Sequence, residues 1–300
     1  MKFIRVPDKP VHTIRVPDTL KHGTAAVETL YSLIATAPEA ARYVLDMEDV
    51  HFVEPCGVIG LVTVARSLAD ATGKRVFIKN LGSQVYPYLH RMNLFQAAGE
   101  WLRPIELMSE EWSRNANTIN LLELTQISGV ENVYTVVERA QSIFTPWLAP
   151  DDLDNLIRVI SELCQNIYQH SGDPHGCVLI QKYHSEVQHK VSICLAVGDS
   201  GCGIRSSLMP RFRGLGDEPL DFIRAAMDGN FTCRRNNKGG LGLRTVRDIA
   251  TDYNGYVTVR SESASITDWG KRKGGMQYAT NLTQLAGTQV SVKMYADFCS

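Results

Sequence analysis

Short apolar strands alternate with helices along the first hundred residues of this 300-residue chain, and this alternation limits the fold more than any other feature. The apolar runs Tyr43–Asp46 and Arg75–Lys79 predict strands. Apolar residues at helical spacing predict helices at Gly23–Glu39, Gly57–Ala71 and Gln84–Met92. Because strands that alternate with helices are typical of an α/β unit, we expect such a unit over residues 1–104.

The chain begins with two similar octamers and has a polar stretch further on. FIRVPDKP and TIRVPDTL share the run IRVPD, and two strand-like copies in succession predict a short hairpin. Residues 105–116 are polar and show no periodicity, which predicts a linker. A second unit is then expected over residues 117–300.

The second unit is predicted to mix strands and helices. Strands are expected at Ile119–Ile127, Cys177–Tyr183, Val191–Val197, Gly255–Glu262 and Thr288–Met294. Helices are expected at Val130–Phe144, Pro150–His170, Pro219–Met227 and Leu243–Tyr253. Residues 205–238 are rich in Gly, Arg and Asn, and such a long irregular stretch predicts a functional lid. Residues 264–286 are expected to form a mobile insertion.

Charge and composition exclude several classes of protein. The formal net charge is −1, and no long run of either sign occurs, so neither nucleic acid nor a membrane surface is expected as partner. No apolar run reaches the roughly 18–20 residues that span a bilayer, and the first residues lack the apolar core of a signal peptide. The seven cysteines are odd in number and form no CxxC pair. These features predict a cytoplasmic protein.

One predicted helix carries three polar side chains on one face. In ISELCQNIYQHS, Glu162, Asn166 and His170 are spaced four residues apart, which places them in one stripe. An amide oxygen such as that of Asn166 is a suitable Mg²⁺ ligand, and a carboxylate beside it can orient a water or a hydroxyl. A solvated polar face is the alternative interpretation of this stripe.

Two glycine-rich segments add a second set of candidate residues. In VGDSGCGI, Asp199 stands at a strand end, where its carboxylate can accept a hydrogen bond from the exocyclic amine of adenine. Gly201 and Gly203 would let the backbone approach a purine closely, although an ordinary glycine turn remains the alternative. In KGGLGLRTVRDIA, glycines run directly into a helix whose N–H groups attract phosphate. This segment has neither the Walker nor the Rossmann spacing.

A fourth segment, AGTQVSV, places the hydroxyl of Thr288 at the start of the last strand. The order and spacing of the four segments resemble the N, G1, G2 and G3 boxes of the GHKL family, which includes histidine kinases, anti-sigma-factor kinases, type II topoisomerases and Hsp90. The resemblance covers about residues 117–300. It implies a Bergerat fold, an α+β sandwich with a lid between the G1 and G2 boxes, and it implies ATP and Mg²⁺ as cofactors.

The resemblance assigns a role to each matched position. Glu162 corresponds to the catalytic or water-orienting glutamate, and Asn166 to the Mg²⁺-binding asparagine. Asp199 corresponds to the adenine-contacting aspartate, supported by Thr288. The other nucleotide-binding positions are Gly201, Gly203, Lys238, Gly239, Gly240, Leu241 and Gly242. Lys238 stands where the family commonly has a glycine, and its side chain there either contacts a phosphate or faces solvent.

Within the GHKL family, the chain is most similar to the anti-sigma-factor kinases and stand-alone ATPases. The predicted helix before the N box contains no histidine, and no paired dimerisation helices precede it. The usual phosphate acceptor of two-component histidine kinases is therefore missing from its usual place. Bacterial regulation of transcription or stress is the setting that this resemblance implies.

The first unit resembles STAS domains, the fold of anti-sigma-factor antagonists, over about residues 10–104. The segments that carry this resemblance are LDMEDVHFVEPCGVIGLVTVARSL and VFIKNLGSQVYPYLHRMNL. The positions that fit the STAS frame are Asp46, Phe52, Glu54, Gly57 and Leu61. The phosphate-accepting serine position aligns with Pro55, and Cys56 follows it. The resemblance therefore implies a docking module without the usual phosphorylation switch.

Three functions are open on these grounds. The first is an ATPase or a serine/threonine protein kinase of the anti-sigma-factor type that docks a protein partner through its STAS-like unit. The second is a nucleotide-gated interaction module, in which ATP orders the lid with little turnover. The third is an α/β scaffold that binds no nucleotide. A homodimer is compatible with each of them.

Overall fold

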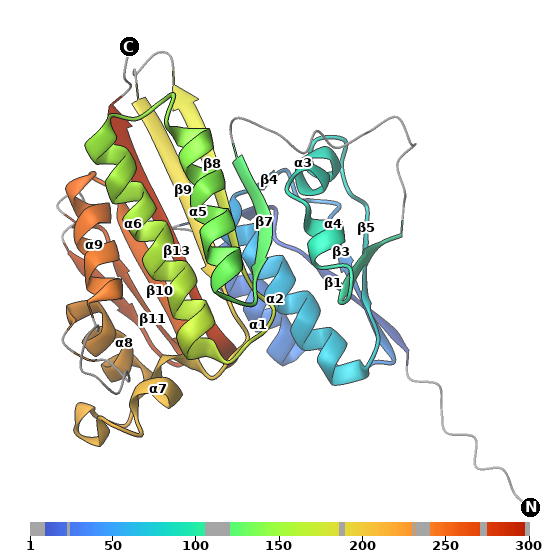
Figure 1. The fold of residues 1–300 in the computed structure, drawn as a ribbon. Helices are drawn as coiled ribbons and strands as arrows, with labels where there is room; N and C mark the ends of the chain where they lie inside the picture. Colours follow the sequence, from blue (N-terminus) through green and yellow to red (C-terminus); the bar gives the residue numbers. More distant parts are fainter. Residues whose placement is uncertain are drawn as a thin grey trace, which may run out of the picture.

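The computed structural model describes residues 10–22, 25–105, 121–185, 190–229, 231, 241–270 and 275–297. In these residues it has a four-stranded sheet, a seven-stranded sheet and a two-stranded pair. Helix α2 (Pro55–Thr72) lies between the two larger sheets (Figure 1). We refer to the described residues 10–105 as the N-terminal unit and to the described residues 121–297 as the C-terminal unit.

The four-stranded sheet belongs to the N-terminal unit and is parallel, with the order β1-β3-β5-β6. Its strands are β1 (Val11–Arg15), β3 (Arg42–Asp46), β5 (Val76–Lys79) and β6 (Leu102–Pro104), and a separate parallel pair joins β2 (Thr19–Leu20) to β4 (Phe52–Val53). The helices are α1 (Ala26–Thr36), α2, α3 (Val85–Arg91) and α4 (Leu94–Ala97). The predicted α/β alternation is confirmed, whereas α4 and β6 were not predicted.

Helix α2 is apolar on nearly all sides because both of its faces are covered. Pro55 begins the helix, where its missing N–H would have had no partner within the helix, and Gly73 ends it with a φ of 65°. Residues on every turn are buried, among them Ile59, Leu61 and Val64. A helix that is apolar all round is typical of a buried position. The first part of α2, residues 55–65, occupies such a position between the two sheets, whereas Ser67, Asp70 and Ala71 near its end are exposed.

The hairpin predicted from the two octamers stays a prediction, because the first octamer lies outside the described residues except for Pro10. Strand β1 pairs in parallel with β3, and β2 pairs in parallel with β4, so β1 and β2 do not pair with each other. Ile14 and Val16 are buried, and a parallel partner within an α/β unit covers such residues better than an isolated hairpin does. Residues 1–9, with most of the first octamer, and residues 106–116 of the predicted linker lie outside the described residues.

The seven-stranded sheet belongs to the C-terminal unit and is antiparallel, with the order β12-β11-β10-β13-β9-β8-β7. Its strands are β7 (Leu121–Ile127), β8 (Gly176–Ser185), β9 (Lys190–Gly198), β10 (Tyr256–Glu262), β11 (Ala264–Asp268), β12 (Met276–Ala279) and β13 (Leu285–Asp297). Its helices are α5 (Val130–Phe144), α6 (Pro150–Asn166), α7 (Gly203–Leu208), α8 (Pro219–Asp228) and α9 (Gly242–Asp252).

The helices of the C-terminal unit cover only one face of its sheet. Helices α5, α6 and α9 lie on that face, and α2 of the N-terminal unit packs against β8, β9 and β13 from the other side (Figure 1). This arrangement confirms the predicted α/β fold class, with a helix-covered antiparallel sheet in the C-terminal part. The N-terminal unit therefore occupies a face that the C-terminal helices leave open.

Two predictions for the C-terminal unit need correction. The described part of residues 264–286 is not the predicted insertion, because β11 and β12 extend the sheet at its edge and the alternating residues Ala264, Ile266 and Asp268 are buried. The predicted lid at 205–238 is not structureless, because α7, a 3₁₀ turn (Arg213–Leu215) and α8 occupy most of residues 203–228. Residues 230 and 232–240 of that lid lie outside the described residues.

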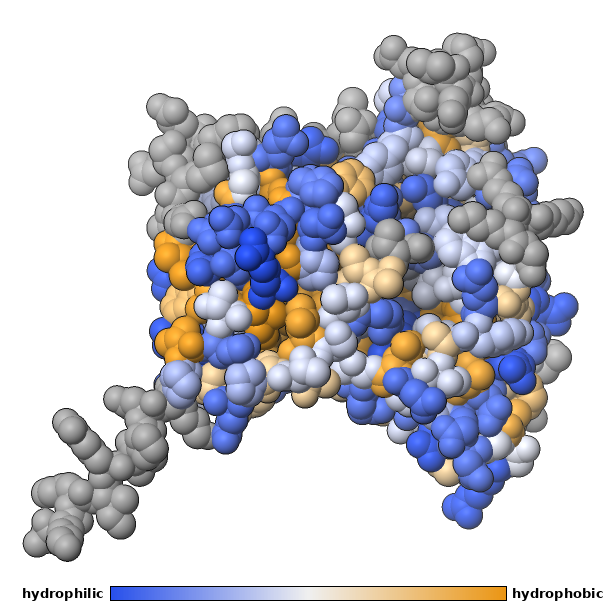
Figure 2. Space-filling view, turned by 180° about the vertical axis from the view of Figure 1, so that it is seen from behind, coloured by the Kyte–Doolittle hydropathy of each residue, from blue (hydrophilic) through white to orange (hydrophobic). Residues whose placement is uncertain are grey.

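Large hydrophobic residues are exposed on both units. Viewed from behind, hydrophobic residues gather on the half that carries the N-terminal unit (Figure 2). The exposed large hydrophobic residues of this unit are Val11, Phe52 and Ile105. Among the described helices, none is long and apolar enough to cross a bilayer.

Candidate functional site

A pocket of about 530 Å³ opens in the C-terminal unit, where β9 and β13 meet α6, α7 and α9. Ligand pockets in proteins span roughly 300–1,000 Å³, so this volume suits a ligand of nucleotide size. The predicted site residues that line it are Glu162, Asn166, Asp199, Gly203, Leu241, Gly242 and Thr288, together with His170 of the polar stripe. Lys238, Gly239 and Gly240 lie outside the described residues.

Asp199 forms the buried end of the pocket. It directly follows β9, its backbone N–H donates to the carbonyl of Thr288 at 3.0 Å, and its Oδ1 accepts the N–H of Gly201 at 2.9 Å. Burial disfavours the charged carboxylate and, despite the hydrogen bond from Gly201, raises the pKa of Asp199 to about 6. A buried acceptor that still ionises near neutral pH is suited to bind an amino group.

The glycines after Asp199 serve the packing of the protein itself. A Cβ atom at Gly201 would overlap the backbone carbonyl of Ser171, which accepts the N–H of Cys202 at 2.9 Å. Gly203 has a φ of 76°, a conformation that favours glycine. From the sequence we expected these glycines to let a purine approach the backbone. At Gly201, the space left by the missing side chain is instead filled by the backbone of Ser171, at the end of the helical segment that follows α6.

Glu162 and Asn166 lie opposite the N-terminus of α9. Both side chains come from the last turns of α6, and a Cβ atom at Gly242 would stand 2.7 Å from Oε2 of Glu162 and 3.7 Å from Nδ2 of Asn166. The 11-residue helix α9 begins at Gly242, so its positive dipole end and unpaired N–H groups face the same volume. The acid, the amide and the anion-binding helix end predicted from sequence are therefore brought together.

The polar stripe does not continue as a regular α-helix. After Asn166 the helical segment widens into a π-helix, Ile167–Ser171, which Gly172 ends with a φ of 70°. Local π-helical turns are often found at functional sites. The turn carries His170, which lines the pocket, so the predicted helix to His170 is confirmed with a change in its winding.

Thr288, at the buried end of the pocket, contacts Ser261, a residue that sequence reasoning missed. Its Oγ1 lies 3.2 Å from Oγ of Ser261, which also donates to the carbonyl of Gly287 at 3.0 Å. Ser261 in turn accepts the N–H of Ile204 at 3.0 Å. Ser261 therefore joins β10, β13 and α7 beside the pocket. The sequence did not mark Ser261 as a site residue, because serine is common near the end of a strand.

Asp173 is a second residue that sequence reasoning missed. Its carboxylate accepts the N–H of Ser200 at 2.7 Å and the N–H of His175 at 2.9 Å. It also forms two hydrogen bonds with the guanidinium of Arg66, at 2.7 and 2.9 Å. Although burial alone would raise it, these hydrogen bonds lower the pKa of Asp173 below its ordinary value. The buried carboxylate is thus ionised, and its hydrogen bond holds Ser200, which follows Asp199 in the sequence.

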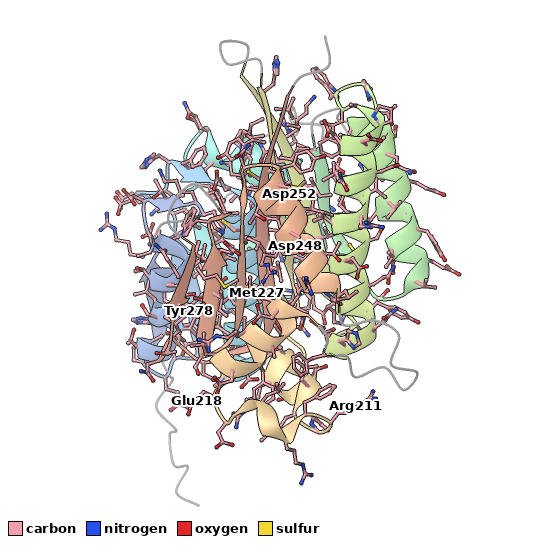
Figure 3. The ribbon with its side chains drawn as sticks, turned by 90° about the vertical axis from the view of Figure 1, so that its left-hand side faces the viewer. Arg211, Glu218, Met227, Asp248, Asp252 and Tyr278 are labelled. Atoms are coloured by element: carbon pink, nitrogen blue, oxygen red, sulfur yellow. The ribbon has the colours of Figure 1, made fainter. Side chains whose placement is uncertain are left out.

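The segment between β9 and α9 forms another wall of the pocket. Its pocket-lining residues are Ile204, Ser207, Leu208, Ala226 and Phe231. Figure 3 labels Arg211 and Glu218 on the part of this segment that projects beyond α8 and α9. The described part of the predicted lid therefore contacts the pocket.

A pocket of this size, with a buried acceptor at one end and a helix N-terminus at the other, is typical of domains that bind nucleotides. Residues 151–294 match the model of the family described as "Histidine kinase-, DNA gyrase B-, and HSP90-like ATPase". The C-terminal unit therefore contains a domain of this ATPase family, which binds ATP, generally with Mg²⁺. No curated protein matches the chain. The anti-sigma-factor branch and the STAS-like unit remain predictions.

Proposed function

We propose that the protein binds Mg²⁺–ATP in this pocket and uses Glu162 to promote attack on the γ-phosphate. The attacking group is water, or a serine or threonine hydroxyl of a protein partner. The observation that carries the proposal is the close approach of Gly242 to both Glu162 and Asn166. The side chains of Glu162 and Asn166 and the N-terminus of α9 border one volume, and this supports the proposal.

The residues present fit the metal as well as the nucleotide. Mg²⁺ commonly takes one or two protein oxygens and completes its shell with phosphate oxygens and water, and the side-chain oxygen of Asn166 supplies such a ligand. When bound, the ion neutralises charge on the phosphates. The space left by the missing side chain of Gly242 keeps α9 close to this position.

Glu162 is the proposed catalytic residue because its carboxylate lies beside the N-terminus of α9, where we propose that the γ-phosphate binds. Its carboxylate repels phosphate oxygens, so it adds little to ATP binding. It can accept a hydrogen bond from the attacking water or hydroxyl and orient its lone pair toward phosphorus. Positioned general-base assistance of this kind contributes about 10²–10⁴-fold to a rate.

Two variants separate binding from turnover. Asp199→Asn should weaken ATP binding by a factor that corresponds to about 1.5–3 kcal/mol, because it removes a charge-assisted hydrogen bond. Glu162→Ala should bind ATP at least as tightly as the wild type but release phosphate about 10²–10⁴ times more slowly. Calorimetric titration with Mg²⁺–ATP and a phosphate-release assay measure the two effects. If the wild-type protein binds no ATP, the proposal is wrong, and equal turnover in Glu162→Ala would assign the base elsewhere.

A nucleotide-gated interaction module is the second candidate function. It is favoured by the wall that α7 and α8 contribute to the pocket, because a ligand in contact with Ile204 and Leu208 would also fix the position of these helices. Binding of ATP by the wild-type protein without phosphate release, in the presence and absence of candidate partners, would favour this function over catalysis.

The N-terminal unit is the proposed docking module for a protein partner in a cytoplasmic, bacterial regulatory setting. The STAS-like phosphorylation position, Pro55, is buried at the start of α2. Glu54 beside it forms an ion pair with Lys293 of β13 at 3.3 Å. This end of α2 is thus occupied by the C-terminal unit of the same chain. A partner would dock on another surface of the N-terminal unit.

A further inference from the structure

The two strands at the base end of the pocket present alternate residues to opposite faces of the sheet. Asp199 and Thr288 line the pocket. Gly198 and Gln289, their neighbours in sequence, contact α1 and α2 of the N-terminal unit instead. Side chains along a strand point alternately to the two faces of the sheet. Contacts that fix Gly198 and Gln289 on the face toward the N-terminal unit therefore also fix Asp199 and Thr288 on the face toward the pocket.

Helix α2 meets this part of the sheet at two points. A Cβ atom at Gly198 would stand 2.5 Å from Cγ2 of Ile59, so the helix packs directly against the strand backbone. One turn further on, Oγ1 of Thr63 accepts a hydrogen bond from Nε2 of Gln289 at 2.7 Å. The hydroxyl of Tyr31 on α1 donates to Oε1 of the same Gln289. Gln289 is therefore held at both ends of its amide by the N-terminal unit.

A third contact reaches the turn that follows Asp199. Arg66 of α2 binds both carboxylate oxygens of Asp173, and its guanidinium also lies 5.1 Å from the ring centroid of Trp101. The exposed fraction of the Asp173 side chain is 1%, and that of Arg66 is 15%. A buried bidentate pair of this kind has a fixed geometry, and removal of one partner leaves a buried charge without compensation.

The three α2 residues form one stripe, since Ile59, Thr63 and Arg66 are spaced by four and three residues.

One backbone N–H group in the turn after Asp199 depends on this stripe. The N–H of Gly201 donates to Asp199, and the N–H of Cys202 donates to Ser171, so both partners belong to the C-terminal unit. The N–H of Ser200 donates to Asp173, whose carboxylate is held in turn by Arg66.

We propose that α2 of the N-terminal unit is a positioning element of the nucleotide site, in which Arg66 acts through Asp173 and Ser200 to hold the Asp199 carboxylate against the 6-amino group of adenine. The inference rests on the proposed function. Arg66 is a positioning residue, because its effect on the ligand passes through Asp173. It should therefore control base selectivity more than phosphate binding, which depends on α9 and Asn166.

Base selectivity tests this role directly. Inosine triphosphate carries a 6-oxo group where ATP carries the 6-amino group, so the ratio of the two dissociation constants reports the position of the Asp199 carboxylate. Arg66→Ala should weaken ATP binding about tenfold, leave inosine triphosphate binding within about twofold, and so reduce the preference for ATP about fivefold or more. Arg66→Lys, which keeps the charge but loses the bidentate geometry, should restore part of the preference.

Lys293→Ala provides the matched control. It also removes an ion pair between the two units, the one with Glu54, but Lys293 lies five residues along β13 from Thr288. This variant should keep the wild-type ratio even if its melting temperature falls. Melting temperatures show whether each variant is folded. If Arg66→Ala does not fold, the ratio of the two dissociation constants is measured on Arg66→Lys instead.

The outcomes distinguish the inference from the proposed function. If the wild type binds ATP and Arg66→Ala and Arg66→Lys keep its selectivity, the inference is overturned while ATP binding stands. Equal weakening of ATP and inosine triphosphate would also overturn it, because a purely structural role has that result. Failure of the wild-type protein to bind either nucleotide would overturn the proposed function itself.

Discussion

The buried carboxylate of Asp199 should give ATP binding a pH dependence of definite sign. Burial raises the pKa of this group from its ordinary 3.8 to about 6 in the folded protein. Below that pH the carboxyl group is protonated, and it loses the charge that favours the 6-amino group of adenine. ATP affinity should therefore be full above about pH 7 and fall by up to tenfold for each pH unit below about 6.

The Asp199→Asn variant is the control for this prediction. Titration calorimetry from pH 5 to 8 would measure the affinity of both proteins. The variant lacks the titrating group, so its affinity should vary less over this range, the remaining change coming from the phosphates of the ligand. A wild-type curve parallel to that of the variant would show that ionisation of Asp199 does not contribute to binding.

At the scale of single residues, sequence reasoning found the groups that line the pocket and missed those that hold them. Glu162, Asn166 and Asp199 were predicted because their spacing and neighbours fit a recognised chemistry, and all three line one pocket. Arg66 and Asp173 are 107 residues apart in sequence. Nothing in the pattern around either residue shows that the two units pack so as to join them.

At the scale of elements, the segment from α7 to α8 should respond to nucleotide. Ile204 and Leu208 of α7 line the pocket, whereas Arg211 and Arg213 just beyond this helix are exposed. Without a ligand, trypsin should cleave after these two arginines, because cleavage needs only local opening. An ATP analogue that contacts α7 should slow this cleavage several-fold, as measured by mass spectrometry of the digest over time.

Two comparisons make the proteolysis specific. Arg91, at the end of α3, is also exposed and should be cleaved at the same rate with and without nucleotide. In Asp199→Asn, at a nucleotide concentration that saturates only the wild type, protection at Arg211 should be lost. Cleavage after Arg211 and Arg213 that is indifferent to nucleotide in the wild type would contradict gating by this segment.

The elements with clear periodicity were predictable, and those that depend on distant partners were not. Helix α5 occupies Val130–Phe144 as predicted, and α9 lies within a residue of its predicted bounds, because both carry an apolar stripe on a polar background. Strands β11 and β12 have five and four residues, too few for alternation to stand out beside glycine-rich neighbours. The parallel pairings of β1 with β3 and of β2 with β4 were not predicted, because their partner strands are distant in sequence.

At the scale of the whole molecule, the two units share one hydrophobic core. A single cluster of buried residues joins Leu45, Leu61 and Ile78 of the N-terminal unit to Leu179 and Ala196 of the C-terminal sheet. A second cluster lies between that sheet and α5, α6 and α9. Since the sheet is common to both clusters, loss of the N-terminal unit would expose an apolar sheet face to water. The units should therefore unfold together rather than independently.

Cooperative unfolding can be tested with two tryptophans. Trp101 lies in the N-terminal unit and Trp147 in the C-terminal unit, and variants that keep only one tryptophan report each unit by fluorescence in urea. The two midpoints should coincide. Ile59→Ala, which removes a buried side chain packed on Gly198, should lower the free energy of unfolding by roughly 2–5 kcal/mol and move both midpoints equally.

A substitution in the C-terminal unit tests whether the two units also unfold together when the change is made on the other face of the sheet. Val136 of α5 is fully buried in the cluster that lies far from α2, and Val136→Ala should also move both midpoints together, because the sheet transmits the loss to the N-terminal unit. Nucleotide should act in the same way, since a ligand at one hundred times its dissociation constant stabilises the folded state by about 2.7 kcal/mol. If Val136→Ala or ATP moves the Trp147 transition and leaves that of Trp101 unchanged, the two units fold independently and the contacts of α2 do not couple them.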